Sequence, residues 1–344
     1  MSAELNQVIR SFAGRRVLVL GDMVADEYLM GRPDRISREA PVLILHHAGS
    51  FIRPGGATNP AYNLRRLGAD TRVIGVIGDD EMGRRLCSTL EEAGMDTDCL
   101  FVDTGRPTST KTRIVARGSQ EAQQQIVRID RVDTSALSPM LRDQVIDAVR
   151  PLLAGIDALL VSDYENGVIS PEMIDACLPR ARQAGVRVVV DSHGDLFRFT
   201  GVTAATPNQP EAAASLHRRS ASEEEVDQAG TDLLTGMDAD GILITRGSEG
   251  IALYERGRAP YKLPIATESE LLVDPTGAGD TVAAVFTLAL SCGAGMRQAT
   301  YLGNVAAGEV VRQLGAATLT AADLTRAVET SRLPAPLGIA VERT

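Results

Sequence analysis

The chain has 344 residues, enough for one large α/β domain or two smaller ones. Its 45 acidic and 35 basic residues give a formal net charge of −10, and it has only six Phe, six Tyr and no Trp, which argues against general nucleic-acid binding. A content of 44% hydrophobic and 23% charged residues excludes wholesale disorder.

The N-terminal segment, residues 1–16, mixes polar and apolar residues and lacks the apolar core of a signal peptide. The longest apolar run, residues 282–290, has half the length that a membrane span needs. The four cysteines lie far apart without a CxxC motif, which predicts free thiols rather than disulfides or a zinc site: Cys87, Cys99, Cys177 and Cys292. We therefore expect a cytoplasmic protein without a membrane partner.

Apolar runs alternate with amphipathic patterns along most of the chain. The runs are rich in Val, Ile and Leu and predict buried strands at residues 17–20, 72–77, 158–161, 186–190 and 241–244. Apolar residues recur every three to four positions in the predicted helices, residues 57–67, 81–93, 141–153, 171–184 and 223–234. This alternation predicts a parallel sheet covered by helices on both faces, with a ligand site at the carboxyl ends of the strands.

Two stretches interrupt this alternation. Residues 27–53 show no helical period, and residues 108–116 and 125–129 carry β-branched residues in a pattern typical of a hairpin. We expect these strands, within residues 27–53 and 107–130, to form a small separate sheet that covers the site or pairs with a second subunit. One principal domain, residues 1–330, is expected, followed by a C-terminal tail at 331–344.

Residues 274–280 (DPTGAGD) form the most informative segment. We expect a strand at 271–273 to enter a small-residue turn that opens a hydrophobic helix at 283–291. The backbone amides of Gly277, Ala278 and Gly279 at a helix N-terminus suit a phosphoryl group, and Asp280 could take a proton from an attacking hydroxyl. The alternative is a tight turn with Asp280 as an N-cap. The chain has neither a P-loop motif nor a dinucleotide G-x-G-x-x-G after its first strand.

Residues 274–280 resemble the C-terminal signature of the ribokinase/PfkB superfamily of sugar kinases. Residues 55–69 resemble its N-terminal double-glycine signature, residues 207–211 (PNQPE) its N-x-x-E motif, and residues 245–250 its nucleotide-side turn. Within the superfamily, the chain is most similar to the heptose 7-phosphate kinases, on the motifs at residues 21–26, 35–42, 110–113 and 162–167. The resemblance implies a three-layer α/β/α ribokinase-like fold with a mostly parallel central sheet and a β lid.

By this resemblance, Asp280 is the catalytic base and the amides of Gly277–Gly279 form the anion hole. The sugar hydroxyls would be bound by four residues whose groups suit adjacent hydroxyls or a close backbone approach: Asp26, Gly55, Gly56 and Asn59. From local sequence alone, Asp26 could equally cap a turn after the first strand.

The resemblance also assigns a nucleotide side. Asn208 and Glu211 would hold Mg²⁺ through water, although the same spacing is typical of a capping box at a helix start. Thr245 and Gly247 would contact the ATP phosphates or ribose, and Asn304 the adenine, or Asn304 could be a polar position on a small-residue helix. Asp274 would help to hold a monovalent cation such as K⁺.

Three cations would bind the phosphate already present on a sugar phosphate: Arg35, Lys111 and Arg113. Alternate spacing places Lys111 and Arg113 on one face of a strand, which could also be a solvated edge. Asp163 is assigned to the substrate by the resemblance. The chain departs from the usual Asp-Pro-Lys-Gly of heptose kinases at residues 191–194 (DSHG), so His193 stands in place of a lysine and a phosphate contact there would depend on pH.

The sequence therefore predicts an ATP- and Mg²⁺-dependent kinase that phosphorylates the anomeric hydroxyl of D-glycero-D-manno-heptose 7-phosphate, as a homodimer joined through the lid. No H-x-G-H nucleotidyltransferase motif is present, so a stand-alone kinase is expected. The alternatives are a related kinase for another sugar or sugar phosphate, and a non-catalytic nucleotide or sugar sensor on the same fold.

Overall fold

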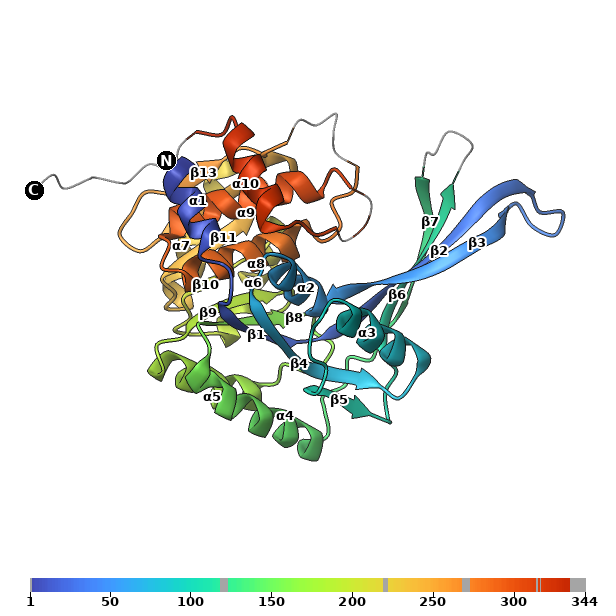
Figure 1. Ribbon diagram of the computed structural model, residues 1–344, viewed down its shortest axis with the longest axis horizontal. Helices are drawn as coiled ribbons and strands as arrows, with labels where there is room; N and C mark the ends of the chain where they lie inside the picture. Colours follow the sequence, from blue (N-terminus) through green and yellow to red (C-terminus); the bar gives the residue numbers. More distant parts are fainter. Residues whose placement is uncertain are drawn as a thin grey trace, which may run out of the picture.

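The computed structural model describes residues 2–117, 123–218, 222–267, 273–313, 315 and 317–334. Within them, nine strands form the main sheet in the order β13-β12-β11-β10-β9-β8-β1-β4-β5 (Figure 1). The strands are β1 (Arg16–Gly21), β4 (Asp70–Gly78), β5 (Leu100–Asp103), β8 (Ala158–Asp163), β9 (Arg187–Ser192), β10 (Ala204–Ala205), β11 (Gly241–Thr245), β12 (Ile251–Glu255) and β13 (Tyr261–Leu263). Pairing is parallel from β5 to β11, whereas β12 and β13 add antiparallel to that edge.

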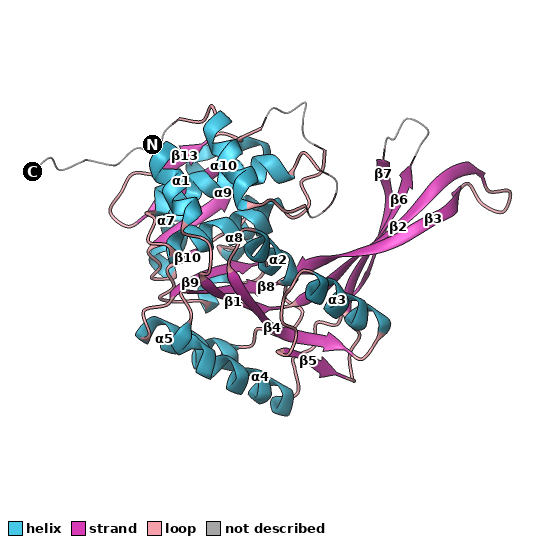
Figure 2. Ribbon diagram, viewed as in Figure 1, coloured by secondary structure: helices cyan, strands magenta, loops and turns pink. Residues whose placement is uncertain are grey.

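Helices cover both faces of the main sheet (Figure 2). One face carries α1 (Ser2–Arg10), α2 (Thr58–Arg66), α3 (Glu81–Glu92), α8 (Ala278–Ser291), α9 (Met296–Val310) and α10 (Ala321–Thr330). The other carries α4 (Pro139–Leu152), α5 (Pro171–Gln183), α6 (Gln209–Ser215) and α7 (Glu223–Gly236). Alternate side chains of β1 supply the two cores, because Val17 and Val19 face the first set of helices while Leu18 and Leu20 face the second.

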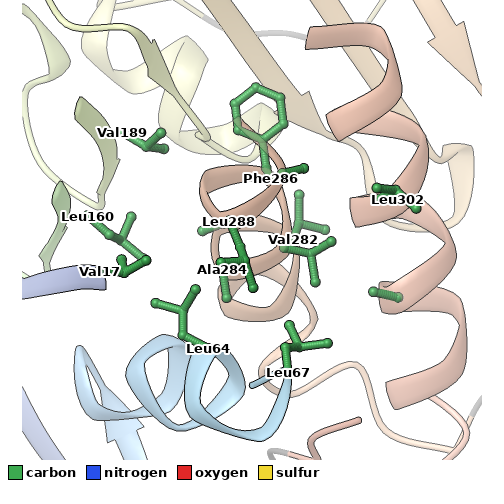
Figure 3. Packing of buried hydrophobic residues seen from close by; sticks show 14 of the residues in the cluster. Val17, Leu64, Leu67, Leu160, Val189, Val282, Ala284, Phe286, Leu288 and Leu302 are labelled. Carbon is green, nitrogen blue, oxygen red and sulfur yellow. The ribbon is translucent and has the colours of Figure 1, made fainter. Parts of the chain in front are cut away.

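The helix α8 lies at the centre of the first core. Every residue from Asp280 to Leu290 is buried, and beyond the first turn Thr287 is the one polar residue of this stretch. Val282, Phe286 and Leu288 pack among side chains from β1, β8, β9 and α2 (Figure 3). This packing holds the first turn of α8 at a defined place beside the carboxyl ends of the strands.

The lid is a separate sheet of four strands among the described residues, in the order β3-β2-β6-β7. It consists of β2 (Met23–Ile36), β3 (Leu43–Gly56), β6 (Ser109–Arg117) and β7 (Gln123–Arg131), and it projects away from the main body (Figure 1). The roots of the strands lie at the body, since β2 follows β1 after a single residue and β3 runs into α2. The predicted lid is therefore confirmed as a four-stranded sheet.

The five predicted strands and five predicted helices of the main body are confirmed, with small shifts of their ends. The prediction of a strand at 271–273 is wrong at Val273, and Leu271 and Leu272 lie outside the described residues. Val273 is 58% exposed, and its N–H donates to the carbonyl of Val311 at the end of α9, so this segment docks on a helix instead of a strand. The helix predicted to begin at residue 283 begins at Ala278.

At the C-terminal end, α10 ends at Thr330, and residues 335–344 of the expected tail lie outside the described residues. All four cysteines are free thiols, as predicted. Within the described part of the chain, none of the helices combines the length and apolar character of a membrane span.

Candidate active site

The first turn of α8 forms the centre of the candidate site. Gly277 is the N-cap of this helix and has a left-handed backbone with φ of +80°, which glycine adopts at little cost. Gly279 and Asp280 therefore belong to the helix itself and not to a preceding turn. A Cβ built on Gly279 would meet no atom of the described chain within 4 Å, so this side of the turn is open. The Ala278 N–H donates to the Pro275 carbonyl at 3.2 Å, so the positive potential of the helix start and the neighbouring N–H groups are what suit an anion here.

The Asp280 carboxylate is held by one donor on each oxygen. The Asn59 side-chain amide donates to Oδ2 at 2.6 Å, and the Tyr164 hydroxyl donates to Oδ1 at 2.7 Å. Asp280 is 8% exposed. Burial, together with the neighbouring Asp191 carboxylate, raises the pKa of Asp280 to about 7, against the effect of the two donors. A carboxylate that titrates near neutral pH is suited to accept and release a proton.

Tyr164 was not among the predicted site residues. Its ring lies at the meeting point of three parts of the site, since the Lys111 ammonium is 4.9 Å from the ring centroid and the His193 ring centroid is 4.3 Å away. The available signal was its position one residue after the buried strand β8, at the carboxyl edge of the sheet. The sequence could not show that its hydroxyl reaches Asp280, 116 positions further along the chain.

The residues predicted to bind the sugar lie where the lid joins the main body. Asp26 on β2 and Arg113 on β6 are both buried, and the guanidinium Nη1 lies 2.7 Å from Oδ1 of the carboxylate. The β3 backbone passes close to this pair, because a Cβ on Gly55 would lie 2.8 Å from the Asp26 carboxyl carbon. Gly56 has φ of +52°, a second reason for glycine where β3 turns into α2. The structure brings Asp26, Gly55 and Gly56 together, as expected.

Lys111 and Arg113 lie on the same face of β6, which looks toward the body of the protein. Arg113 contacts Asp26 and the Tyr28 ring, whereas Lys111 lies over the ring of Tyr164. The interpretation of this strand face as a solvated edge is therefore excluded. Because Arg113 is already neutralised by Asp26, Lys111 is the cation of the pair better suited to a substrate phosphate.

A cavity of about 1100 Å³ extends from Asp280 toward the strands β11 and β12. Its lining includes the predicted catalytic and nucleotide-side residues: Asn208, Glu211, Thr245, Gly247, Gly277, Ala278, Gly279 and Asn304. Asn304 is buried and donates to the carbonyl of Pro264 at 2.8 Å. The cavity also contains Arg218 and Arg246, two cations that were missed as site residues; Arg246 pairs with Glu223 and Glu249.

Asn208 and Glu211 form the capping box at the start of α6. The Glu211 N–H donates to the Asn208 side chain at 2.9 Å, and the Asn208 N–H donates to Glu211 Oε2 at 2.7 Å. The other oxygen, Oε1, lies 3.3 Å from His193 Nδ1. Burial raises the pKa of Glu211, whereas burial and the Lys111 charge lower the pKa of His193 and favour a neutral ring. The cap leaves part of the Glu211 carboxylate facing the cavity.

Asp191, the first residue of the DSHG segment, is a buried carboxylate that was not predicted as a site residue. It lines the cavity, and its Oδ1 accepts a hydrogen bond from the Thr206 hydroxyl at 2.9 Å. Burial raises its pKa to about 7, with a further contribution from the Glu211 charge. The site therefore gathers several acidic groups whose charges raise one another's pKa values.

Asp274 lies just outside the cavity and stabilises the turn before α8. Its Oδ1 accepts from the Thr276 N–H at 2.9 Å, and its Oδ2 accepts from the Gly315 N–H at 2.8 Å. Within the described residues, no group of three His, Cys, Asp or Glu side chains converges as a metal site. A bound cation would therefore depend on water, backbone carbonyls or a ligand for most of its coordination.

The structure places two predicted substrate residues, Arg35 and Asp163, away from the open part of the site. Arg35 lies nine positions beyond Asp26 on β2, roughly 30 Å along the strand, where its side chain is 57% exposed and contacts Asp34. It is not part of this chain's own site. Asp163 is buried beneath the site, where it accepts from the Ser192 hydroxyl and the Glu165 N–H, so it holds the turn after β8 in shape and does not face the cavity.

The pattern for pfkB family carbohydrate kinases matches residues 15–322. The bifunctional protein HldE of Pelobacter propionicus is 39% identical over 312 residues, which are 90% of this chain and 62% of that protein. The chain thus spans less than two thirds of the length of this curated relative.

Two solved structures share the fold. Ribokinase of Arabidopsis thaliana, complexed with ribose and ATP, has a TM-score of 0.69 and 19% identity, covering 92% of this chain and 99% of that chain. Phosphofructokinase-2 of Escherichia coli, in complex with potassium, has a TM-score of 0.71 and 18% identity, covering 92% and 98%. The predicted ribokinase-like fold is confirmed.

Proposed function

Because the chain belongs to the pfkB family of carbohydrate kinases, it is an ATP-dependent sugar kinase, and we propose that its acceptor is D-glycero-D-manno-heptose 7-phosphate. The product would be the 1,7-bisphosphate. The observation that carries the proposed chemistry is the Asp280 carboxylate in the first turn of α8, held by Asn59 and Tyr164 at the end of the cavity. The motif resemblance and the HldE relative support the choice of sugar.

In the proposed reaction, Asp280 accepts the proton of the anomeric hydroxyl as its oxygen attacks the γ-phosphorus of ATP. The new oxygen–phosphorus bond forms as the bond to the β–γ bridging oxygen breaks, and ADP leaves with that electron pair. The backbone amides of Gly277, Ala278 and Gly279 stabilise the charge on the transferred phosphoryl group. Asp26 and Gly55 position the sugar, and this placement accounts for much of the rate gain.

Mg²⁺ fits the nucleotide side of this cavity. Oε2 of Glu211 caps α6, whereas Oε1 lies 3.3 Å from His193 Nδ1 at the cavity wall. We propose that Asn208 and Glu211 hold the ion through water. When bound, Mg²⁺ neutralises charge on the ATP phosphates. The proposal also includes a monovalent cation beside Asp274.

Lys111 supports the choice of a phosphorylated acceptor. Its ammonium lies over Tyr164 at the lid side of the site, opposite the nucleotide side, and carries no ion pair in the described chain. A sugar placed with its anomeric hydroxyl at Asp280 would extend toward the lid, and its far phosphate would meet this cation. Arg113 lies two positions along β6 on the same face, but its charge is balanced by Asp26, so Lys111 is proposed as the main phosphate ligand.

A homodimer through the lid remains part of the proposal. The outer lid exposes apolar side chains that a single chain leaves in water: Ile36, Val42, Leu43, Ile126, Val127 and Ile129. Their burial against a second lid would be favourable. Light scattering should give twice the monomer mass, and a monomer at micromolar concentration would contradict this part.

The experiment that tests the function is an ADP-release assay with a panel of acceptors: heptose 7-phosphate, ribose, fructose and fructose 6-phosphate. We expect the highest kcat/KM for the heptose 7-phosphate. Activity on ribose or fructose with none on heptose 7-phosphate would select another sugar. Nucleotide binding by calorimetry without turnover of any sugar would instead favour a sensor.

A further inference from the structure

The loop after β8 places a tyrosine hydroxyl on the candidate base and is itself held by a buried carboxylate. We propose that Tyr164 is a positioning residue for Asp280, and that Asp22 holds Tyr164 in place through the backbone of residues 164–168. This inference deepens the proposed kinase function and rests on it, because it names two residues that prepare the base for proton transfer.

The contact between Tyr164 and Asp280 has the geometry of a strong hydrogen bond. The hydroxyl oxygen lies 2.7 Å from Oδ1, and the Asn59 amide occupies the other oxygen at 2.6 Å. Each carboxylate oxygen has two lone pairs, so one donor on each leaves room for an incoming hydroxyl while preventing rotation of the group. A hydrogen bond to the ionised form also stabilises that form.

Asp22 binds the same loop through three backbone N–H groups. Its Oδ2 accepts from Tyr164 at 2.7 Å and from Asn166 at 3.2 Å, and its Oδ1 accepts from Val168 at 3.1 Å. Asp22 is 1% exposed, so these bonds form without competition from water. Three N–H groups converging on one buried carboxylate define the path of the loop.

The loop needs such a restraint because its backbone is unusual. Glu165 has φ of +58° and Gly167 has φ of +87°, so two of its residues are in the left-handed region. For a residue with a Cβ, such as Glu165, this conformation costs energy and persists only when surrounding contacts enforce it. Asp22 supplies those contacts on both sides of Glu165, and the order of the loop decides where the Tyr164 hydroxyl lies.

The Tyr164 hydroxyl contacts the base, whereas the ring makes the other contacts of this residue. Removal of its hydroxyl would leave the ring, and with it the contacts to Lys111 and His193, unchanged. Besides Tyr164, the titratable and charged groups around Asp280 come from five other elements or turns: Asp26 on β2, Lys111 on β6, Asp191 on β9, His193 after β9, and Glu211 on α6. Because the Asp191 and Asp26 carboxylates raise the pKa of Asp280, a donor that opposes them should have a measurable effect.

The test is Tyr164→Phe in the full chain, with Tyr261→Phe as the matched control. The Tyr261 hydroxyl is buried on β13 and has no hydrogen-bond partner in the described chain, so its loss should change nothing at the site. The pKa of Asp280 is read directly by ¹³C NMR of aspartate-labelled protein, with the signal assigned by its disappearance in Asp280→Asn. We expect Tyr164→Phe to raise this pKa by about one unit, since a hydrogen bond to a charged group is lost.

The pH profile of ADP release gives the second measurement. The apparent pKa of the acidic limb of the kcat/KM profile should rise by about one unit in Tyr164→Phe. At pH values below this pKa the activity should therefore be about tenfold lower than in the wild type, and it should recover at high pH. A purely structural role would lower the rate equally at every pH, and an unmoved Asp280 signal would overturn the assignment of Tyr164.

Asp22→Asn tests the second half of the proposal without altering the tyrosine. Its amide cannot accept all three N–H groups, so we expect the Asp280 pKa to rise in the same direction as in Tyr164→Phe. A folded Asp22→Asn protein with a wild-type Asp280 signal would refute the role of Asp22. The NMR measurement of the Asp280 pKa tests the roles of Tyr164 and Asp22 and does not require turnover. A wild-type protein inactive on every sugar would instead refute the kinase function, without affecting the NMR result.

Discussion

Asn59 on α2 and Asp280 on α8 lie 221 positions apart in the chain, and the Asn59 amide donates to the Asp280 carboxylate at 2.6 Å. Asn59 is oriented in turn by Asn63, whose amide donates to its side-chain oxygen at 3.0 Å, and the Thr281 hydroxyl donates to Asn63 at 3.4 Å. This series of hydrogen bonds therefore begins and ends on the first turn of α8. Asn59 thus contacts the carboxylate of Asp280, whereas the sequence suggested a contact with the sugar hydroxyls alone.

We expect Asp280→Asn to lower kcat by at least about a thousandfold while ATP binding survives, because the amide cannot take up a proton and the α8 backbone amides remain. ADP release and calorimetric titration with an ATP analogue measure the two effects. Asp323→Asn is the matched control, since Asp323 is likewise the third residue of a helix, α10, away from the cavity. Turnover near the wild-type rate would remove Asp280 as the base.

Lys111→Met should raise the KM for a sugar phosphate about tenfold, because the cation is lost while most of the apolar stem remains. The effect should be absent with an unphosphorylated acceptor, and comparison of the two acceptors provides the internal control. Equal KM changes for both kinds of acceptor would show that Lys111 does not bind the phosphate.

Arg113→Ala should lower the free energy of unfolding by about 3–5 kcal/mol, because it leaves the buried Asp26 carboxylate without its partner.

Gly55→Ala should weaken sugar binding, because the new Cβ would lie 2.8 Å from the Asp26 carboxyl carbon and displace that side chain. We expect the sugar KM to rise about tenfold or more with little change in the KM for ATP. Gly155→Ala is the control, since a Cβ there has Arg16 Nη1, at 3.7 Å, as its nearest neighbour. An unchanged sugar KM in Gly55→Ala would mean that Asp26 does not need its present position.

Glu211→Gln should raise the Mg²⁺ concentration for half-maximal activity about tenfold, since it keeps the size and capping oxygen of the residue but removes its charge. Glu225→Gln makes the same change in the second capping box, at the start of α7 and outside the cavity. That control should keep the wild-type dependence on Mg²⁺. If both variants respond alike, the role of Glu211 is limited to capping.

The buried Asp191 should make the protein less stable as pH rises. Burial raises its pKa from 3.8 to about 7, so between these values the folded state binds a proton that the unfolded state has lost. The free energy of unfolding should fall through this window, by up to about 1.4 kcal/mol per pH unit for each such proton. Asp191→Asn should make the slope shallower by up to that amount, as measured by urea unfolding at pH 5, 6, 7 and 8.

Asp323→Asn serves as the control for this slope as well. Hydrogen bonds from Thr320 lower the pKa of Asp323, so the group is ionised in both states above pH 5 and its removal should leave the slope unchanged. Asp22 and Asp280, with pKa values raised to about 6 and about 7, contribute in the same direction as Asp191. A slope in Asp191→Asn identical to that of the wild type would contradict the burial argument.

Local sequence was sufficient for about half of the elements of the main body and for the chemistry of one turn, whereas elements such as α1, α9, β12 and β13 were not predicted. Period and composition located the strands and helices, because a buried strand and an amphipathic helix each repeat at their own spacing. The segment DPTGAGD identified the anion-binding helix start, since Gly277 must adopt φ of +80° and Gly279 must leave the approach open. Both kinds of signal depend only on residues that are close together in the chain, so they can be recognised from the sequence.

Tertiary structure alone decided which side chains meet at Asp280. Tyr164, just after β8, and Asn59 on α2 donate to Asp280. Asp22 binds the loop that contains Tyr164, more than 140 positions further along the chain. Arg35 lies far from Asp280 because it is near the distal end of the long strand β2. No local pattern contains such contacts, because they depend on how separate elements pack around one buried helix. The sequence by itself therefore determined the kind of reaction and the helix proposed to serve it, and the packing determined the neighbours of Asp280, the proposed base.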